Sequence, residues 1–248
     1  MCTLLIGRDV TGAGEIVVGA NRDEDPARPS EPPNVLVASP RIVGGRDRVS
    51  GGTWLALRAG PALTMLLNRP PVPGKPPGER SRGLLVMDVA AAADPRAAAR
   101  AEAATGRYGP CTLVFASPDA CWWLAISGTT GDRATREGEI APGWHAITHA
   151  ELDDLSEPRT RWLSGQLGAL RVAAAEPALE ALAALLAHHG DATSPAVCIH
   201  SGRMPTVSAS LVFLARERTI YRHADGRPCT TPFVDVSTLL APNVAGGA

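Results

Sequence analysis

Lysine is almost absent from this chain of 248 residues, because Lys75 is the one lysine among 24 basic residues. The 25 acidic residues bring the formal net charge to −1, so the chain lacks the positive excess of proteins that bind nucleic acid or anionic membranes. No apolar run reaches the length of a transmembrane helix, and the N-terminus lacks the charged-then-apolar profile of a signal peptide. These absences predict a cytoplasmic protein with no nucleic-acid partner and no transmembrane segment.

Paired cysteine motifs are also missing. The chain has five cysteines, an odd number with no CxxC spacing, which argues against a disulfide framework and a zinc ribbon. They are Cys2, Cys111, Cys121, Cys198 and Cys229. Cys198 and His200 are two residues apart on one face of a predicted strand, but no further ligand follows at a useful spacing. The sequence therefore predicts no metal site.

The order of predicted elements favours an α+β protein. Hydrophobic residues make up 45% of the chain, enough for a sizeable core. Strands are predicted at 2–6, 15–20, 53–57, 62–67, 112–116, 122–126, 144–147, 196–199, 207–214 and 219–223, and helices at 80–93, 95–104, 159–173 and 177–189. Residues 25–40 and the proline-rich 70–77 are predicted to be irregular, the latter being either a lid or a long connection. Because strands and helices do not alternate as βαβ units, we expect antiparallel sheets with outer helices in one domain, residues 1–248.

The residues with the clearest chemistry are Cys2 and the polar run 21–24 that ends an apolar strand. If Met1 is removed, Cys2 carries a thiol and a free α-amine, with ordinary pKa values of about 8.5 and about 8, and the amine can activate the thiol. Strand alternation places Asn21 and Asp23 on one face, predicted to face the cysteine, and Arg22 with Glu24 on the other. The alternatives are that Cys2 is a small buried hydrophobic residue and that the polar run is a solvated strand end.

A set of short motifs in the first eighty residues resembles the NRDE family, whose eukaryotic members are named for transport and Golgi organisation. The motifs are Met1-Cys2-Thr3, Ala20-Asn21-Arg22-Asp23-Glu24, Ala27-Arg28-Pro29, Gly44-Gly45-Arg46-Asp47, Gly51-Gly52-Thr53-Trp54-Leu55, Leu67-Asn68-Arg69 and Ser81-Arg82-Gly83. Weaker matches occur at 144–154 and at Gly202-Arg203. The family is in turn similar to cysteine N-terminal-nucleophile (Ntn) hydrolases, which cleave amides of bile acids and penicillins.

This resemblance implies a four-layer αββα sandwich and a small-molecule amide or acyl ligand, with no cofactor required. It implies that Cys2 is the nucleophile, that Asp23 binds the terminal amine, and that Asn68 is an oxyanion-hole side chain. Arg203 matches a late arginine of those hydrolases. The chain departs from them in two ways: Ala20 rather than an arginine precedes Asn21, and His149 stands where they have a second asparagine.

The resemblance leaves a second function open. Eukaryotic members of the family are associated with haem trafficking and with lipid or acyl-CoA handling, so the same pocket would then belong to a non-catalytic carrier, with haem as a possible ligand. In that case a cysteine or histidine contacts the iron, and Arg46 and Arg203 face propionates or phosphates. Trp54 is expected to be either pocket wall or core, and Arg22 is expected beside the ligand site.

Overall fold

The computed structural model of the chain describes residues 2–71, 73, 78–127 and 135–241. Part of the proline-rich segment predicted to be irregular, residues 72 and 74–77, lies outside the described residues. Within the described residues, no helix is both long enough and apolar enough to cross a membrane.

Thirteen strands and four α-helices make up the described part of the chain. The strands are β1 (Thr3–Arg8), β2 (Ile16–Asp23), β3 (Ser30–Val37), β4 (Ile42–Asp47), β5 (Leu55–Arg58), β6 (Ala62–Asn68), β7 (Cys111–Ala116), β8 (Cys121–Ile126), β9 (Thr135–Glu139), β10 (Gly143–Ile147), β11 (Thr206–Leu214), β12 (Thr219–Ala224) and β13 (Val234–Asp235). The helices are α1 (Arg82–Ala91), α2 (Pro95–Ala104), α3 (Pro158–Ala169) and α4 (Ala175–Leu186), with a short 3-10 helix, η1 (Ser237–Leu240).

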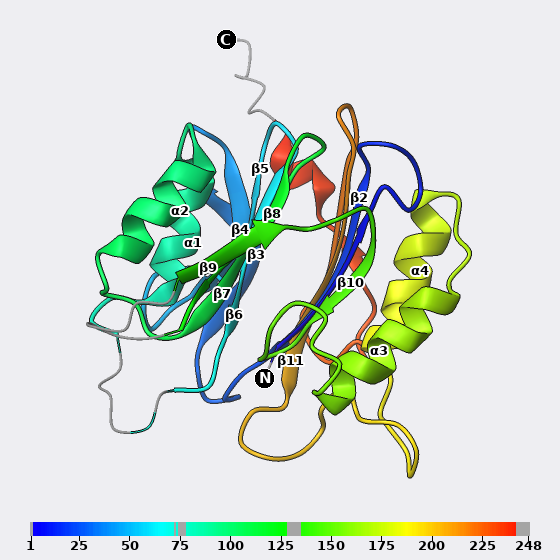
Figure 1. The fold of residues 1–248 in the computed structure, drawn as a ribbon. Coiled ribbons are helices and arrows are strands. Elements are labelled where there is room, and N and C mark those ends of the chain that lie inside the picture. The colour runs from blue at the N-terminus through cyan, green and yellow to red at the C-terminus, as the bar shows by residue number, and fades with distance from the viewer. Residues whose placement is uncertain (1, 72, 74–77, 128–134, 242–248) are drawn as a thin grey trace.

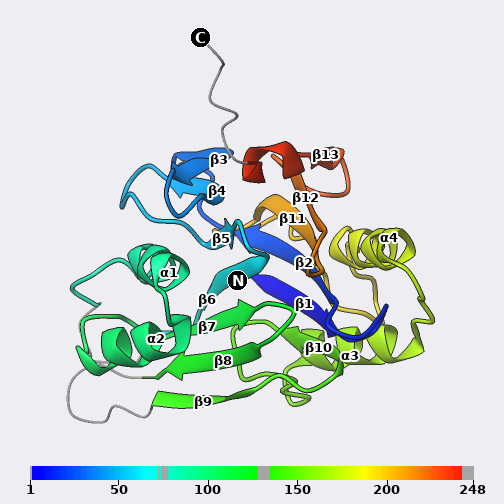
Figure 2. The same cartoon turned by 90° about the horizontal axis from the view of Figure 1, so that it is seen from above.

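The elements form a four-layer αββα sandwich, as predicted. One antiparallel sheet has the order β10-β1-β2-β11-β12-β13, and the other has the order β3-β4-β5-β6-β7-β8-β9. The two sheets lie face to face, with α1 and α2 outside the seven-stranded sheet and α3 and α4 outside the six-stranded sheet (Figure 1). Seen from above, β1, β2 and β6 lie at the centre of the molecule (Figure 2). The first strand, β1, therefore lies in the middle of the sandwich.

Alternation along the strands separates the hydrophobic core into three clusters. Leu4 and Ile6 belong to the cluster between the sheets, whereas Leu5 belongs to the cluster beneath α3 and α4. A third cluster fills the space between the seven-stranded sheet and α1 and α2. In β2, Ile16 and Val18 likewise point between the sheets, and this parity decides which way each residue of the following polar run projects.

Two local predictions were wrong, and some strands were missed. Residues 25–40 include a strand, β3, which tolerates Pro32 and Pro33 because it is the edge strand of its sheet. The strands β4, β9 and β13 were not predicted either. Residues 196–199 form no strand, because Val197 and Cys198 both donate their backbone N–H groups to the carbonyl oxygen of His188 after α4, at 2.9 and 2.8 Å.

Candidate active site

Cys2 lies just ahead of β1 and faces the space between the two sheets. Its half-buried side chain packs against the inter-sheet cluster, and its Sγ lies 3.8 Å from the backbone carbonyl oxygen of Asp23. Thr3 pairs with Asn21 across β1 and β2, so continuing this register by one residue brings Cys2 level with Arg22. The thiol is therefore adjacent to the polar end of β2.

Opposite charges act on the Cys2 thiol. Burial raises its pKa, the negative charge of Asp23 raises it further, and the positive charge of Arg22 opposes both effects. Burial also raises the pKa of Asp23, opposed in part by a hydrogen bond that Thr206 Oγ1 donates to its carboxylate at 2.7 Å. Because its pKa is raised, the thiol is protonated at neutral pH and needs a base before it can act as a nucleophile.

Arg22 stacks on Trp54 between the sheets. Its guanidinium carbon lies 4.1 Å from the centre of the indole ring, and the Arg22 side chain is only 7% exposed. The cation is paired with Glu24 at 3.7 Å and donates a hydrogen bond to Ser30 Oγ at 3.2 Å. The predicted pairing of Arg22 with Glu24 is thus present, while the stacking fixes the cation beside the thiol.

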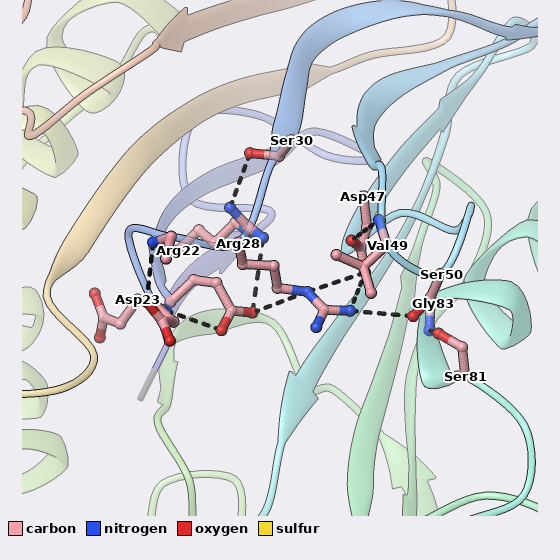
Figure 3. Close-up of polar contacts among 12 residues, drawn as sticks. Arg22, Asp23, Arg28, Ser30, Asp47, Val49, Ser50, Ser81 and Gly83 are labelled. Carbon is pink, nitrogen blue, oxygen red and sulfur yellow. Dashed lines mark hydrogen bonds and ion pairs between the residues drawn. The ribbon is translucent and has the colours of Figure 1, made fainter.

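Three neighbouring cavities, of about 250, 690 and 470 Å³, open beside this pair, and we call them together the arginine groove. Arg28 and Arg82 line all three. Arg28 reaches across the groove to Asp47 and Ser50 (Figure 3). The other arginines lining it are Arg22, Arg69, Arg80 and Arg203. Such a concentration of guanidinium groups suits a ligand that carries a carboxylate or phosphate.

Glycines at two of the motifs permit the close packing of the groove wall. A Cβ on Gly45 would lie 2.4 Å from the Trp54 ring, so only glycine lets the indole lie flat against β4. A Cβ on Gly52 would lie 2.3 Å from the carbonyl carbon of Gly83, where Thr53 donates a backbone hydrogen bond to the Gly83 oxygen at 3.1 Å. The motifs around these residues therefore meet in space at the N-terminus of α1.

Asn21 does not face the cysteine, contrary to the prediction. Its Nδ2 donates to the carbonyl oxygens of Leu186 and Val197, at 2.9 and 3.1 Å, on the side of the sheet that α4 covers. Cys2 packs on the opposite side, against the inter-sheet cluster. Strand alternation along β2 was predicted correctly, but the face that meets Cys2 was not. The Asn21 amide instead holds α4 and the segment after it against the sheet.

The other predicted site residues are scattered around the groove. Asn68, at the exposed end of β6, lines two of its cavities, and Arg203 lines the largest. Arg46 lines none of them and lies 3.9 Å from Glu31 on the neighbouring edge strand. His149 follows β10 beside β1; burial lowers its pKa, and its Nδ1 has no hydrogen-bond partner among the described residues.

Several site residues were missed by sequence reasoning. Arg28 and Arg82 lie inside the motifs Ala27-Arg28-Pro29 and Ser81-Arg82-Gly83, and those motifs were the signal that could have identified them. Thr206 gave no signal, because its bond to Asp23 depends on the pairing of β11 with β2 over a separation of 183 residues. Sequence spacing offered no further metal ligand for Cys198 and His200. His189 and Cys229 join them, outside the arginine groove.

The arginine groove does not fit haem. Among the described residues that line its three cavities there is no histidine and no cysteine, and Met204 is the one sulfur-bearing side chain. Haem iron in proteins is held by histidine, cysteine, tyrosine or a histidine–methionine pair. The groove provides the anion-binding groups that propionates require but lacks these axial ligands.

Comparison with known families identifies the chain's relatives. A family model described as Transport and Golgi organisation 2 matches residues 1–195. The chain belongs to this family. The match spans the cysteine, the polar end of β2 and the arginine-groove motifs up to α1, and it ends ahead of Cys198, His200 and Cys229. A search of curated proteins finds no match.

Solved structures show that the fold of this Transport and Golgi organisation 2 family member is that of the Ntn hydrolases. A Caenorhabditis elegans ortholog of N-acylethanolamine-hydrolyzing acid amidase is similar with a TM-score of 0.55 and 13% identity, over 85% of this chain and 92% of that one. Penicillin V acylase from Agrobacterium tumefaciens gives 0.56 and 12%, over 95% and 86%. The C2A mutant of conjugated bile acid hydrolase from Clostridium perfringens gives 0.51 and 12%, over 97% and 94%. At these identities the likeness establishes the fold alone.

Proposed function

We propose that this protein is a cysteine Ntn amidohydrolase or acyltransferase that acts on a small amide or acyl substrate. The observation that carries the proposal is the position of Cys2. Its thiol lies between the sheets of an Ntn-type sandwich, beside Asp23 and level with Arg22. The structural relatives named as an acid amidase, an acylase and a bile acid hydrolase act on amide or acyl compounds, which supports the same class of substrate here.

In this mechanism, removal of Met1 frees the α-amine of Cys2. The amine takes the thiol proton as Sγ attacks the substrate carbonyl, which a thiol of raised pKa requires. Asp23 orients the amine, while the Asn68 amide and a backbone N–H stabilise the oxyanion. The tetrahedral intermediate collapses to a thioester as the protonated amine returns its proton to the leaving nitrogen. Water, or another acceptor in a transferase, then releases the acyl group and regenerates the thiol.

The arginine groove supports a substrate with an anionic group. Arg82 lines all three cavities, and its described hydrogen bond goes to a backbone carbonyl, that of Pro110 at 2.9 Å, rather than to a carboxylate. Arg203 lines the largest cavity from the opposite loop. A carboxylate or phosphate held between these two guanidinium groups would position an acyl chain along the groove.

The decisive experiment is intact-mass analysis before and after treatment with a thiol-reactive acyl probe. We expect a mass without Met1 and one acyl adduct, mapped to Cys2 and absent from Cys2→Ala. Amide turnover should be lost in Cys2→Ala and reduced but detectable in Cys2→Ser, because the serine hydroxyl retains an attacking atom but is a weaker nucleophile. Met1 retained in the native protein, or turnover by Cys2→Ala equal to that of the unchanged protein, would rule out the mechanism.

A non-catalytic carrier of an anionic acyl ligand is the second candidate. It is favoured by one observation, that Cys2 lines none of the three cavities while six arginines do. A carrier predicts saturable binding of palmitoyl-CoA that survives Cys2→Ala and weakens in Arg82→Gln. Binding unaffected by Arg82→Gln would contradict this role for the groove, and binding accompanied by Cys2-dependent thioester exchange would favour the enzyme.

A further inference from the structure

Two cysteines and two histidines converge on the side of the molecule where α4 ends. The ligating atoms of His189, Cys198, His200 and Cys229 all lie within 4.8 Å of one another. The two Sγ atoms are 3.6 Å apart, and His200 Nε2 lies 3.6 Å from Cys198 Sγ and 3.2 Å from Cys229 Sγ. The His189 ring stands edge-on to the His200 ring, with 4.6 Å between the ring centres. These groups share no sequence motif.

The separations among Cys198, His200 and Cys229 agree with those of a tetrahedral metal site. With zinc–sulfur bonds of about 2.3 Å and zinc–nitrogen bonds of about 2.0 Å, a tetrahedron places two sulfurs about 3.8 Å apart and a sulfur and a nitrogen about 3.5 Å apart. The three separations lie within about 0.4 Å of these values. A disulfide requires sulfurs about 2.0 Å apart, so the cysteines are spaced for a shared ligand rather than for a bond between them.

Three segments distant in sequence build the cluster, and each is held by its own backbone hydrogen bonds. Beyond α4 the chain turns at Gly190, whose φ of +77° and close approach to Ala196 both require glycine. The carbonyl oxygen of His188 accepts two backbone hydrogen bonds from the segment that carries Cys198. The loop after β12 presents Cys229 within a turn in which two N–H groups donate to the Arg227 carbonyl. The ligands are thus prepositioned without a metal.

We propose that these four residues form a structural zinc site. Two cysteine thiolates balance the charge of Zn²⁺, and two neutral imidazoles complete the coordination, so binding releases the two thiol protons. All four positions of the tetrahedron come from the protein, which leaves no open position for substrate and distinguishes the site from a catalytic zinc centre. No carboxylate is part of the cluster, which disfavours calcium and magnesium.

The site anchors a loop that lines the arginine groove. His200 begins the short loop that carries Arg203 and Met204 along the groove wall, and Thr206 ends it. The Thr206 hydroxyl makes two hydrogen bonds. It donates to the Asp23 carboxylate at 2.7 Å and accepts from the backbone N–H of Ile199 at 2.9 Å. Metal bound at His200 therefore stiffens the segment on which the positions of Arg203 and Asp23 depend.

The first measurement is the metal content of the full-length chain purified without chelator. We expect about one zinc ion per chain, and after its removal about one Co²⁺ bound with the visible bands of tetrahedral cobalt and a near-ultraviolet thiolate-to-cobalt band. Cys198→Ser, Cys229→Ser and His200→Gln should lose the bound metal, whereas Cys2→Ala, which removes a half-buried thiol elsewhere, should keep it. These readouts do not depend on any enzymatic activity.

The second measurement is limited trypsin digestion with and without chelator. Removing the metal should speed cleavage after Arg203 and leave the rate after Arg107, in the exposed turn beyond α2, unchanged. A metal-free chain whose Cys198 and Cys229 are joined in a disulfide would overturn the proposal. So would stoichiometric zinc that persists in all three ligand variants. If a variant fails to fold, the cobalt spectrum of the unchanged chain still decides between thiolate ligation and none.

Discussion

At the scale of the residue, the Cys2 thiol is set between two charges of opposite sign. Asp23 and burial both raise the thiol pKa, while Arg22, held over Trp54, lowers it. In the polar run 21–24, this guanidinium and this carboxylate belong to consecutive residues. Their side chains therefore project from opposite faces of β2, while both charges act on the same sulfur. The arrangement keeps the thiol protonated, and it places a cation where it would stabilise the thiolate that the proposed attack requires.

Substitutions on either side of the thiol should therefore move its pKa in opposite directions. Arg22→Met, which keeps the length of the side chain but removes the charge, should raise the Cys2 pKa, and Asp23→Asn should lower it. A shift of about one unit changes the thiolate fraction at neutral pH about tenfold. The measurement is the pH dependence of iodoacetamide alkylation at Cys2, followed by mass spectrometry. Arg46→Met, at the sheet edge, is the control, and equal profiles for Arg22→Met and Asp23→Asn would disprove the assignment.

At the scale of the element, periodicity predicted most strands and all four helices, because hydrophobic spacing records which face is buried. It failed where long-range pairing decides the structure. β3 survives two prolines only because no strand lies beyond it, and residues 196–199 are held by the end of α4 rather than by a sheet. The same limit applied to the site: alternation along β2 was predictable, but which face meets Cys2 depends on how β1 and the two sheets assemble. The cluster of His189, Cys198, His200 and Cys229 was unpredictable for the same reason.

The contact between Gly52 and Gly83 is the element-scale feature most sensitive to substitution. Gly52→Ala would place a Cβ against backbone atoms that no rotamer change can move, so α1 must shift away from the strand it covers. We expect a loss of about 1–3 kcal/mol in the free energy of unfolding, as for other overpacked sites. Gly165→Ala, at an exposed position of α3 with nothing within 4 Å, should instead stabilise by about 0.5–1 kcal/mol. Chemical denaturation of both variants measures the contrast, which a destabilisation shared by the two would contradict.

At the scale of the whole molecule, polar groups buried between the sheets make stability depend on pH. His223 in β12 is 5% exposed, and its Nδ1 lies 3.1 Å from Ser210 Oγ. Burial lowers its pKa to about 4, and the nearby charge of Arg22 acts in the same direction. The folded state thus resists protonation of this imidazole, whereas the unfolded chain accepts a proton at about pH 6.5. His145 behaves in the opposite way, because a hydrogen bond to Asp153 raises its pKa.

These two histidines should contribute to acid sensitivity with opposite signs. Because the folded-state pKa of His223 is lowered, its contribution to stability is fully present above about pH 6.5 and is lost as the pH falls toward about 4. The free energy of unfolding lost in this way is about 3 kcal/mol. In His223→Gln the free energy of unfolding, measured by urea denaturation across this range, should therefore fall less steeply than in the unchanged protein. For His145 the favourable contribution is present below its ordinary pKa and is lost as the pH rises, so His145→Gln should make the fall steeper. Because the carboxylates are common to all three proteins, the differences between the curves isolate the histidines. Parallel curves for His223→Gln and the unchanged chain would show that His223 titrates alike in the folded and unfolded states, which its position between the sheets should prevent.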